Sequence, residues 1–187
     1  HDCGPTGYGF WVQYSQYGNM FWHNTVIVKT TGVGVNLGSC CAWSRANSFR
    51  NNIVVNLGTG GCIRYGHRSG VLEYNDLDYN CYWAPNGKVC ELEGGTAFTR
   101  GTLAAWKKYF NANRSTLVPQ TGAPPIPTPA QARWDDNSIE ADPGLVSMVK
   151  PYDFHLKGSS PCIDAGTSDT TPRHDLLVIV TRTPDEE

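Results

Sequence analysis

The sequence has few charged residues and no cluster of positive charge. Charged side chains make up 17% of its 187 residues, below the usual quarter, and the formal net charge is −2. The lysines and arginines are scattered, and the longest basic run is the pair Lys107–Lys108. A protein that binds nucleic acid needs clustered Lys and Arg. The charge pattern therefore argues against nucleic acid as a partner.

Long apolar runs are also missing. The longest, Leu176–Val180, is far shorter than the roughly 20 residues that span a bilayer, so we expect no membrane insertion. The chain does not begin with Met and carries no signal peptide. We interpret it as a mature or truncated product. The missing signal peptide says nothing against secretion.

The cysteines form no Cys-x-x-Cys pair, so the sequence predicts no zinc site. They are Cys3, Cys40, Cys41, Cys62, Cys81, Cys90 and Cys162. An odd number leaves at least one free thiol. We expect several to be small buried residues of the core. A short-range disulfide such as Cys81–Cys90 is the alternative, and the sequence does not fix the connectivity.

Glycine and asparagine are abundant, and between residues 20 and 83 they separate short apolar runs. These runs recur about every 8–12 residues, a spacing typical of a sandwich, a barrel or a β-solenoid. The predicted strands are residues 24–29, 34–37, 52–56, 62–65, 71–74 and 78–83.

Internal repeats favour the solenoid. Asn24, Asn52 and Asn80 each begin an apolar triplet, and they follow one another at a spacing of 28. Residues 34–38 also resemble residues 54–58, at a spacing of 20. The two spacings disagree, so either the length of the repeat varies or one of the two likenesses is accidental. Periods in the twenties fit one supersecondary unit per repeat. Because asparagine tolerates left-handed backbone and its amide can bond to an asparagine one repeat away, we expect a ladder of stacked asparagines at related turns.

Residues 102–110 change character and predict a short helix. Thr102 can cap its start, and Leu103, Trp106 and Phe110 fall on one face, so that face should pack against the solenoid. Residues 115–133 hold five of the 12 prolines, a density that no regular strand survives. We expect a Pro-rich surface loop there.

From residue 75 onward the chain carries an ordered string of motifs. They are Asn75-Asp-Leu-Asp-Tyr-Asn-Cys-Tyr-Trp83, Asn137-Ser-Ile139, Asp142-Pro143, Asp153-Phe-His-Leu156 and Ser160-Pro-Cys-Ile-Asp-Ala-Gly166. This string, together with the helix around Trp106, resembles the C-terminal portion of secreted, pectate-lyase-like right-handed parallel β-helix proteins, over roughly residues 45–170.

The resemblance implies an all-β chain folded as one right-handed parallel β-helix, residues 1–187, either a C-terminal fragment or a short member. Two segments depart from the family pattern. Residues 111–133 look like an insertion, and residues 176–187 replace the usual ending with an atypical tail.

The best basic cluster in the chain is Arg64-Tyr-Gly-His-Arg68. Polysaccharide lyases of this fold use a basic residue to abstract a proton next to a uronate, and a cation or an arginine to neutralise the carboxylate. Arg64, His67 and Arg68 are therefore the candidate substrate-binding residues. The alternative is a solvated turn.

A second candidate site lies in Asp76-Leu-Asp78-Tyr-Asn80, where oxygen-bearing side chains alternate. Alternate residues of a strand share a face, so Asp76, Asp78 and Asn80 could converge on a calcium ion. The glycine and distal glutamate of an EF-hand loop are absent. Turn capping is the alternative, and we expect no other cofactor.

The N-terminal residues are rich in aromatic side chains, which either stack on sugar rings or belong to the core. They are Tyr8, Phe10, Trp11, Tyr14, Tyr17, Phe21 and Trp22.

We therefore expect a secreted or cell-surface β-helix module that contacts polysaccharide, as a carbohydrate-binding or structural domain. One alternative is a polysaccharide lyase acting on uronate-containing polymers. Another is an adhesin or filament subunit that self-associates through the ends of its helix. A lyase must stabilise developing charge in place, and the chain offers one basic cluster with no second one facing it. We accordingly expect little or no lyase activity from these 187 residues.

Overall fold

The computed structural model describes residues 7–12, 19–37, 47–66, 76–93, 99–113 and 135–168. Within these residues, short strands stack in parallel into three sheets, and the chain visits the sheets in the same order on each pass. Sheet 1 contains β1 (Phe10–Val12), β4 (Val35–Leu37), β7 (Ile63–Gly66), β10 (Cys90–Glu93) and the antiparallel β11 (Arg100–Gly101). Sheet 2 contains β2 (Met20–Trp22), β5 (Ser48–Arg50) and β8 (Asp76–Asp78). Sheet 3 contains β3 (Thr25–Val28), β6 (Ile53–Asn56), β9 (Cys81–Trp83) and β12 (Ile139–Glu140). The predicted stack of parallel strands is confirmed.

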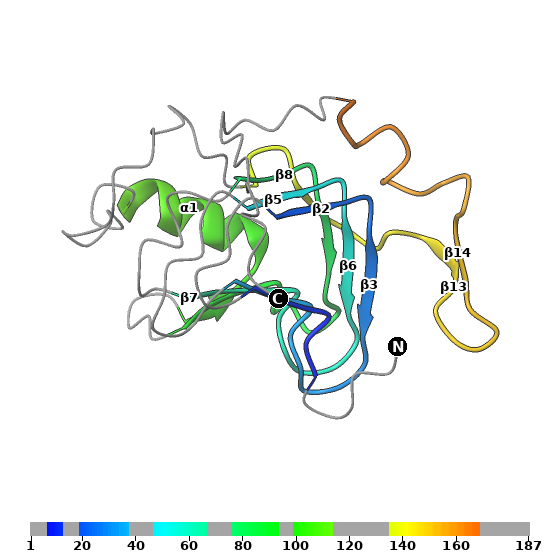
Figure 1. Ribbon diagram of the computed structural model, residues 1–187, viewed down its shortest axis with the longest axis horizontal. Helices are drawn as coiled ribbons and strands as arrows, with labels where there is room; N and C mark the ends of the chain where they lie inside the picture. Colours follow the sequence, from blue (N-terminus) through cyan, green and yellow to red (C-terminus); the bar gives the residue numbers. More distant parts are fainter. Residues whose placement is uncertain are drawn as a thin grey trace, which may run out of the picture.

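The three sheets enclose the apolar core. In Figure 1 sheet 2 lies above, sheet 1 lies below, and sheet 3 joins them on one side. The helix α1 (Leu103–Asn113) lies on the side opposite sheet 3. An antiparallel hairpin, β13 (Leu145–Ser147) with β14 (Asp153–Leu156), lies beyond the outer face of sheet 3.

The predicted repeat of 28 residues is confirmed, because residues 28 apart in the sequence pair between neighbouring strands. Thr25 pairs with Ile53, and Ile53 pairs with Cys81. Of the two alternatives for the likeness at a spacing of 20, the accidental one holds, because residues 35–37 belong to sheet 1 and pair with residues 63–65, whereas residues 54–56 belong to sheet 3. The likeness between those two segments reflects only that both are short buried strands.

The predicted strand at residues 78–83 is broken in two. Tyr79 has a φ of 56°, in the left-handed region that ends a strand, so β8 and β9 meet at a sharp bend and belong to different sheets. His23 and Asn51 have φ values of 56° and 54° at the equivalent bends. The strand predicted at residues 71–74 lies outside the described residues, as do the Pro-rich loop and the atypical tail.

The predicted asparagine ladder is confirmed at these bends. The Asn24 amide donates to Asn52 Oδ1 at 3.0 Å, and the Asn52 amide donates to Asn80 Oδ1 at 3.0 Å. In each pair the backbone N–H of the donating asparagine bonds to the same oxygen. A second, shorter ladder lies just before β2 and β5, where the Asn19 amide donates to Asn47 Oδ1 at 2.8 Å. The ladders satisfy buried polar groups that would otherwise be costly.

The helix α1 is confirmed, and its predicted face is buried. Thr102 Oγ1 accepts a hydrogen bond from the Ala105 N–H at 3.2 Å, so it caps the helix. Leu103, Trp106 and Phe110 belong to the core. The Trp106 ring stacks on Tyr65 of sheet 1, with centroids 4.4 Å apart. None of the helical structure described here is long and apolar enough to cross a membrane.

Close approach between passes requires glycine at the corner between sheets 3 and 1. A Cβ on Gly34 would lie 2.6 Å from the carbonyl oxygen of Cys62, in the next pass. A larger residue would push the two passes apart and stretch the hydrogen bond that the Val35 N–H donates to the Cys62 carbonyl, which is 2.8 Å long.

Candidate functional site

The outward face of sheet 1 carries one row of chemically distinctive side chains. Parallel register aligns Trp11 with Asn36, Asn36 with Arg64, and Arg64 with Glu91, and the antiparallel strand β11 adds Arg100 opposite Glu91. Neighbouring strands lie about 4.8 Å apart. The five residues, called here the sheet 1 row, therefore cross the whole sheet.

One end of the row is an ion cluster around Glu91. Arg64 donates through Nε and Nη2 to Glu91 Oε2, at 2.9 and 2.8 Å. Arg100 Nη2 lies 3.0 Å from Glu91 Oε1, which also accepts the backbone N–H of Gly61 at 2.8 Å. Glu91 is buried, whereas the Arg100 side chain is 39% exposed. Two guanidinium groups share one carboxylate, so the cluster carries one net positive charge.

The other end of the row is aromatic. The Trp11 side chain is 55% exposed, and its ring lies tilted against Tyr8, with centroids 4.9 Å apart. The Tyr8 hydroxyl accepts a hydrogen bond from Arg64 Nη1 at 3.4 Å. This bond connects the aromatic end of the row to the ion cluster. The row thus combines an exposed aromatic ring with a cluster of two guanidinium groups and one carboxylate.

The structure places the predicted substrate-binding residues only in part. Arg64 lies at the centre of the sheet 1 row. His67 and Arg68 lie outside the described residues. The sequence did not identify Glu91 and Arg100 because they come from later strands, and Trp11 was one aromatic residue among seven.

The predicted calcium ligands have separate protein partners. Asp76 accepts Arg50 Nε at 2.7 Å, and Asp78 accepts the N–H and side-chain amide of Asn137 at 2.7 and 2.9 Å. Asn80 belongs to the asparagine ladder. Across the described ranges no three His, Cys, Asp or Glu side chains group as metal ligands. Calcium binding at Asp76, Asp78 and Asn80 stays a prediction.

A fully buried carboxylate, Asp135, lies at the end of the core. It accepts hydrogen bonds from Tyr65 Oη at 2.8 Å, Tyr82 Oη at 2.9 Å and Ser138 Oγ at 2.7 Å. Burial raises the pKa of Asp135 above its ordinary 3.8, and the hydrogen bonds from Ser138 and the two tyrosines offset part of this rise. The Asp135 side chain therefore links its own segment to β7 and β9, which are distant in the sequence.

The raised pKa of Asp135 predicts a pH-dependent stability. The folded chain keeps this proton at pH values where the unfolded chain has lost it, so unfolding releases a proton. The free energy of unfolding should then fall as the pH rises from 3.8 through the folded-state pKa, and level off above it. Asp135→Asn removes the titration and should flatten this fall. Urea unfolding from about pH 4 to about pH 7 measures it.

The exposed neighbour Asp136 provides the matched control. Asp136→Asn should leave the wild-type pH dependence in place. Equal slopes for wild type and Asp135→Asn would contradict the prediction.

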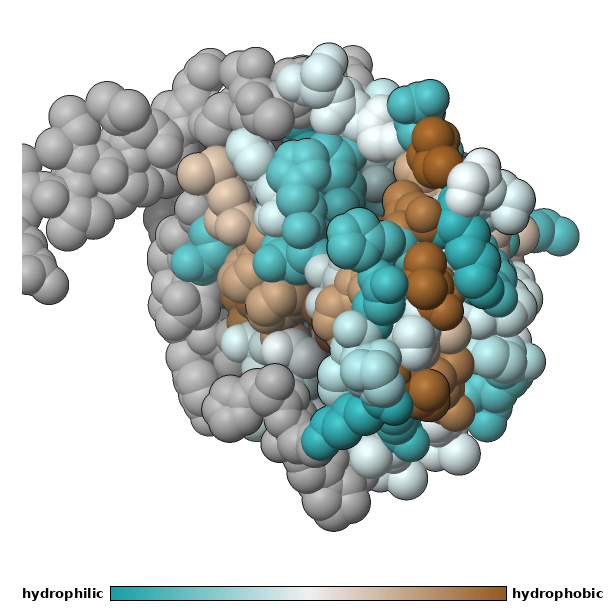
Figure 2. All heavy atoms as spheres, turned by 90° about the vertical axis from the view of Figure 1, so that its right-hand side faces the viewer, coloured by the Kyte–Doolittle hydropathy of each residue, from teal (hydrophilic) through white to brown (hydrophobic). Residues whose placement is uncertain are grey.

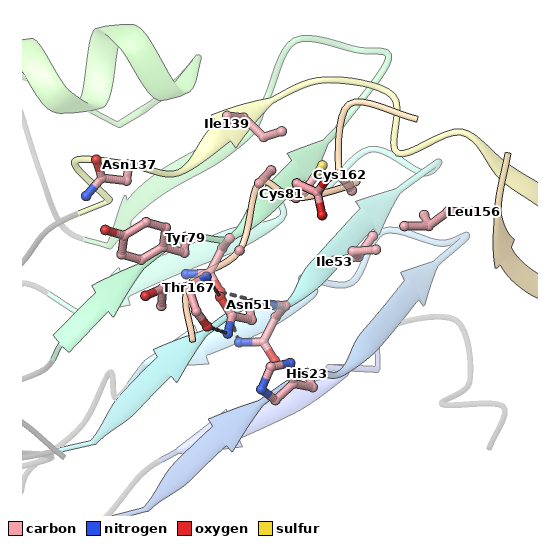
Figure 3. A pocket seen from close by; sticks show the side chains of 15 residues that line it. His23, Asn51, Ile53, Tyr79, Cys81, Asn137, Ile139, Leu156, Cys162 and Thr167 are labelled. Atoms are coloured by element: carbon pink, nitrogen blue, oxygen red, sulfur yellow. Dashed lines mark hydrogen bonds between the residues drawn. The ribbon is translucent and has the colours of Figure 1, made fainter. Parts of the chain in front are cut away.

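A pocket of about 370 Å³ lies outside sheet 3, between the sharp bends and the C-terminal described segment. Figure 3 shows His23, Asn51 and Tyr79 along one part of its wall, and Cys81 and Cys162 together in another. Asn51 fastens the segment: its amide donates to the Thr167 carbonyl at 2.8 Å, and its Oδ1 accepts the Thr167 N–H at 2.9 Å.

The face that holds the β13–β14 hairpin is partly apolar. Figure 2 shows a band of apolar side chains flanked by polar ones on this face. The exposed apolar residues of this part of the chain are Val146, Val149, Tyr152, Phe154 and Ile163. Lys29 lies 5.1 Å from the centroid of the Tyr152 ring and donates to the Met148 carbonyl at 2.6 Å. These contacts attach the hairpin to sheet 3.

Comparisons of the chain with protein families, curated proteins and solved structures give no match. The function is therefore argued from the geometry of the sites.

Proposed function

We propose that the stacked sheets are a right-handed parallel β-helix of the pectate-lyase-like type, and that the protein is a secreted or cell-surface module that binds polysaccharide through the sheet 1 row. Support for the fold comes from the parallel register at 28-residue spacing and the three sheets visited in turn.

The observation that carries the binding proposal is the exposed Trp11 ring in register with the Arg64–Glu91–Arg100 cluster. Sugar rings present flat, partly apolar faces, and aromatic rings stack on such faces. Arg100 is 39% exposed and bonds Glu91 through Nη2, and the donors of an arginine match the geometry of a carboxylate. The excess positive charge of the cluster favours an acidic sugar. The proposed ligand class is therefore a uronate-containing polymer.

Titration calorimetry tests this proposal with polygalacturonate and alginate, and with neutral dextran for comparison. The protein should bind the acidic polymers more tightly than dextran, and added salt should weaken the binding because charges contribute. Trp11→Ala should weaken binding about tenfold, equivalent to about 1.4 kcal/mol. Phe154→Ala removes an aromatic ring of similar exposure, 48% against 55%, from a different face and should leave affinity unchanged.

Equal affinity of Trp11→Ala and wild type would contradict the proposed site, and no binding to any polymer would contradict the proposed function. The same mixtures distinguish the lyase alternative, because cleavage by elimination produces an unsaturated, ultraviolet-absorbing end. Calcium-dependent cleavage that disappears in Arg64→Ala or His67→Ala would favour the lyase.

A further inference from the structure

Two cysteine thiols meet where the C-terminal described segment crosses sheet 3. Cys81 begins β9 and is buried. Cys162 lies in the turn that follows Ser160 and is half-buried. Both residues line the pocket outside sheet 3, and Figure 3 shows them together in its wall. The two residues are 81 positions apart in the sequence.

Both thiols are held in place by the surrounding hydrogen bonds. Ser160 Oγ accepts the backbone N–H of Cys162 at 3.0 Å and donates to the Pro143 carbonyl at 2.6 Å. The Cys81 Sγ lies 3.4 Å from the carbonyl oxygen of Ala141. At the other end of the segment, Asn51 and Thr167 exchange two hydrogen bonds. These hydrogen bonds place Cys81 and Cys162 beside each other in the pocket wall, where a disulfide requires that the two side chains approach.

We propose that Cys81 and Cys162 form a disulfide bond by exchange with a small-molecule disulfide, and that this bond fastens residues 160–167 to sheet 3. The inference concerns a modification site outside the sheet 1 row, and it does not depend on polysaccharide binding.

The order of the exchange follows from the environment of each thiol. The neighbouring Cys81 side chain, together with Ser160, lowers the pKa of Cys162 to about 7, although partial burial and Asp142 act against this. The Cys162 side chain and burial both raise the pKa of Cys81. His23 and Asp164 also line the pocket. Cys162 is therefore the thiolate that attacks first.

The exchange has two balanced steps. The Cys162 thiolate attacks one sulfur of the small-molecule disulfide and releases one small thiolate. Cys81 then loses its proton and attacks the Cys162 sulfur of the mixed disulfide, which releases the second small thiolate. The protein loses two protons and two electrons, and the small-molecule disulfide takes them up to become two thiols.

The two other thiols of the core provide an internal comparison. Burial raises the pKa of Cys62 to about 12, and burial also raises the pKa of Cys90 well above its usual value. Inert, buried thiols of this kind do not exchange readily. Neither Cys62 nor Cys90 should react with the disulfide while the chain is folded.

The test is incubation of the full chain with oxidised glutathione, followed by alkylation of remaining thiols, tryptic digestion and mass spectrometry. The tryptic peptides 69–88 and 158–173 each contain one cysteine, Cys81 and Cys162 respectively, so a cross-link between them is unambiguous. We expect this cross-linked pair, two hydrogens lighter than the free peptides. We also expect the melting temperature to rise by about 5–15 °C and to return to its original value with dithiothreitol.

The variants Cys81→Ser and Cys162→Ser separate the two steps. Cys81→Ser should stop the exchange at a glutathione adduct on Cys162, and Cys162→Ser should leave Cys81 unmodified. The proposal fails if wild-type Cys162 remains a glutathione adduct, if it bonds to another cysteine, or if both thiols stay free. Mapping of the wild-type chain needs no variant, so a variant that folds poorly does not obscure the result.

Discussion

Replacing Trp106 by alanine should lower the free energy of unfolding by about 3–5 kcal/mol, as truncation of a large buried aromatic side chain usually does. Trp106 is fully buried. It stacks on Tyr65 at 4.4 Å and lies 5.7 Å from Phe110, centroid to centroid. Alanine would leave a cavity between α1 and sheet 1, because helix and sheet are each held by other contacts. Urea unfolding measures the loss.

Trp11→Ala is the matched control, because Trp11 is the same residue type but 55% exposed. Its loss of stability should be much smaller than that of Trp106→Ala. An unchanged unfolding midpoint for Trp106→Ala would show that α1 does not pack on the core in solution.

The second large effect should come from the ion pair between Arg50 and Asp76 on the outward side of sheet 2. Both side chains are buried, and Arg50 donates to Asp76 Oδ2 through Nε at 2.7 Å and also through Nη2. Arg50→Met would leave the Asp76 carboxylate buried without its cation. Breaking such a pair typically costs about 3–5 kcal/mol, because the remaining charge is desolvated and uncompensated.

The double variant Arg50→Met/Asp76→Leu measures the interaction between the two side chains separately from the cost of each single change. Removing both charges should cost clearly less than the sum of the two single changes, because no isolated charge remains. The exposed pair Asp153–His155 serves as the control, and Asp153→Asn should change stability little. Strict additivity in the double variant would contradict a coupled, buried pair.

The strands of sheet 3 could be predicted from the sequence because the pattern that marks them is local and is repeated. Asn24, Asn52 and Asn80 each precede an apolar strand, and their side chains need that position to form the ladder. The same holds for Trp106, whose neighbours on the helix share its face. In both cases the residues that identify the element lie within one repeat or one helical turn.

Two strands of sheet 2, β5 and β8, were not predicted as separate strands, and the reason is physical. The strand β5 reads Ser-Phe-Arg and β8 reads Asp-Leu-Asp, so only the central residue of each is apolar. Their polar side chains are nevertheless buried, because Arg50 and Asp76 neutralise each other across a 26-residue separation. A short strand with a charged outward side gives no hydrophobic signal, and the compensating partner is visible only in three dimensions.

The candidate site was predicted in part for the same reason. Arg64 was selected as a member of a local basic run, yet its described partner Glu91 is 27 residues away. The neighbours of a side chain on a parallel sheet come from the preceding and following passes, not from adjacent positions. The sequence therefore identified one residue of the sheet 1 row as basic and did not identify the acid that orients it.

The lengths of the corners suggest how this scaffold accommodates change. The connection from sheet 2 to sheet 3 always has two residues, and that from sheet 3 to sheet 1 always has six. The connection from sheet 1 to sheet 2 instead varies, with seven residues after β1 and ten after β4. Ladder asparagines and close-packed glycines fix the first two lengths, whereas the free-energy cost of a longer connection grows only slowly with its length. A protein engineer could therefore lengthen the connection between β4 and β5 and leave the stacking of the passes unaltered.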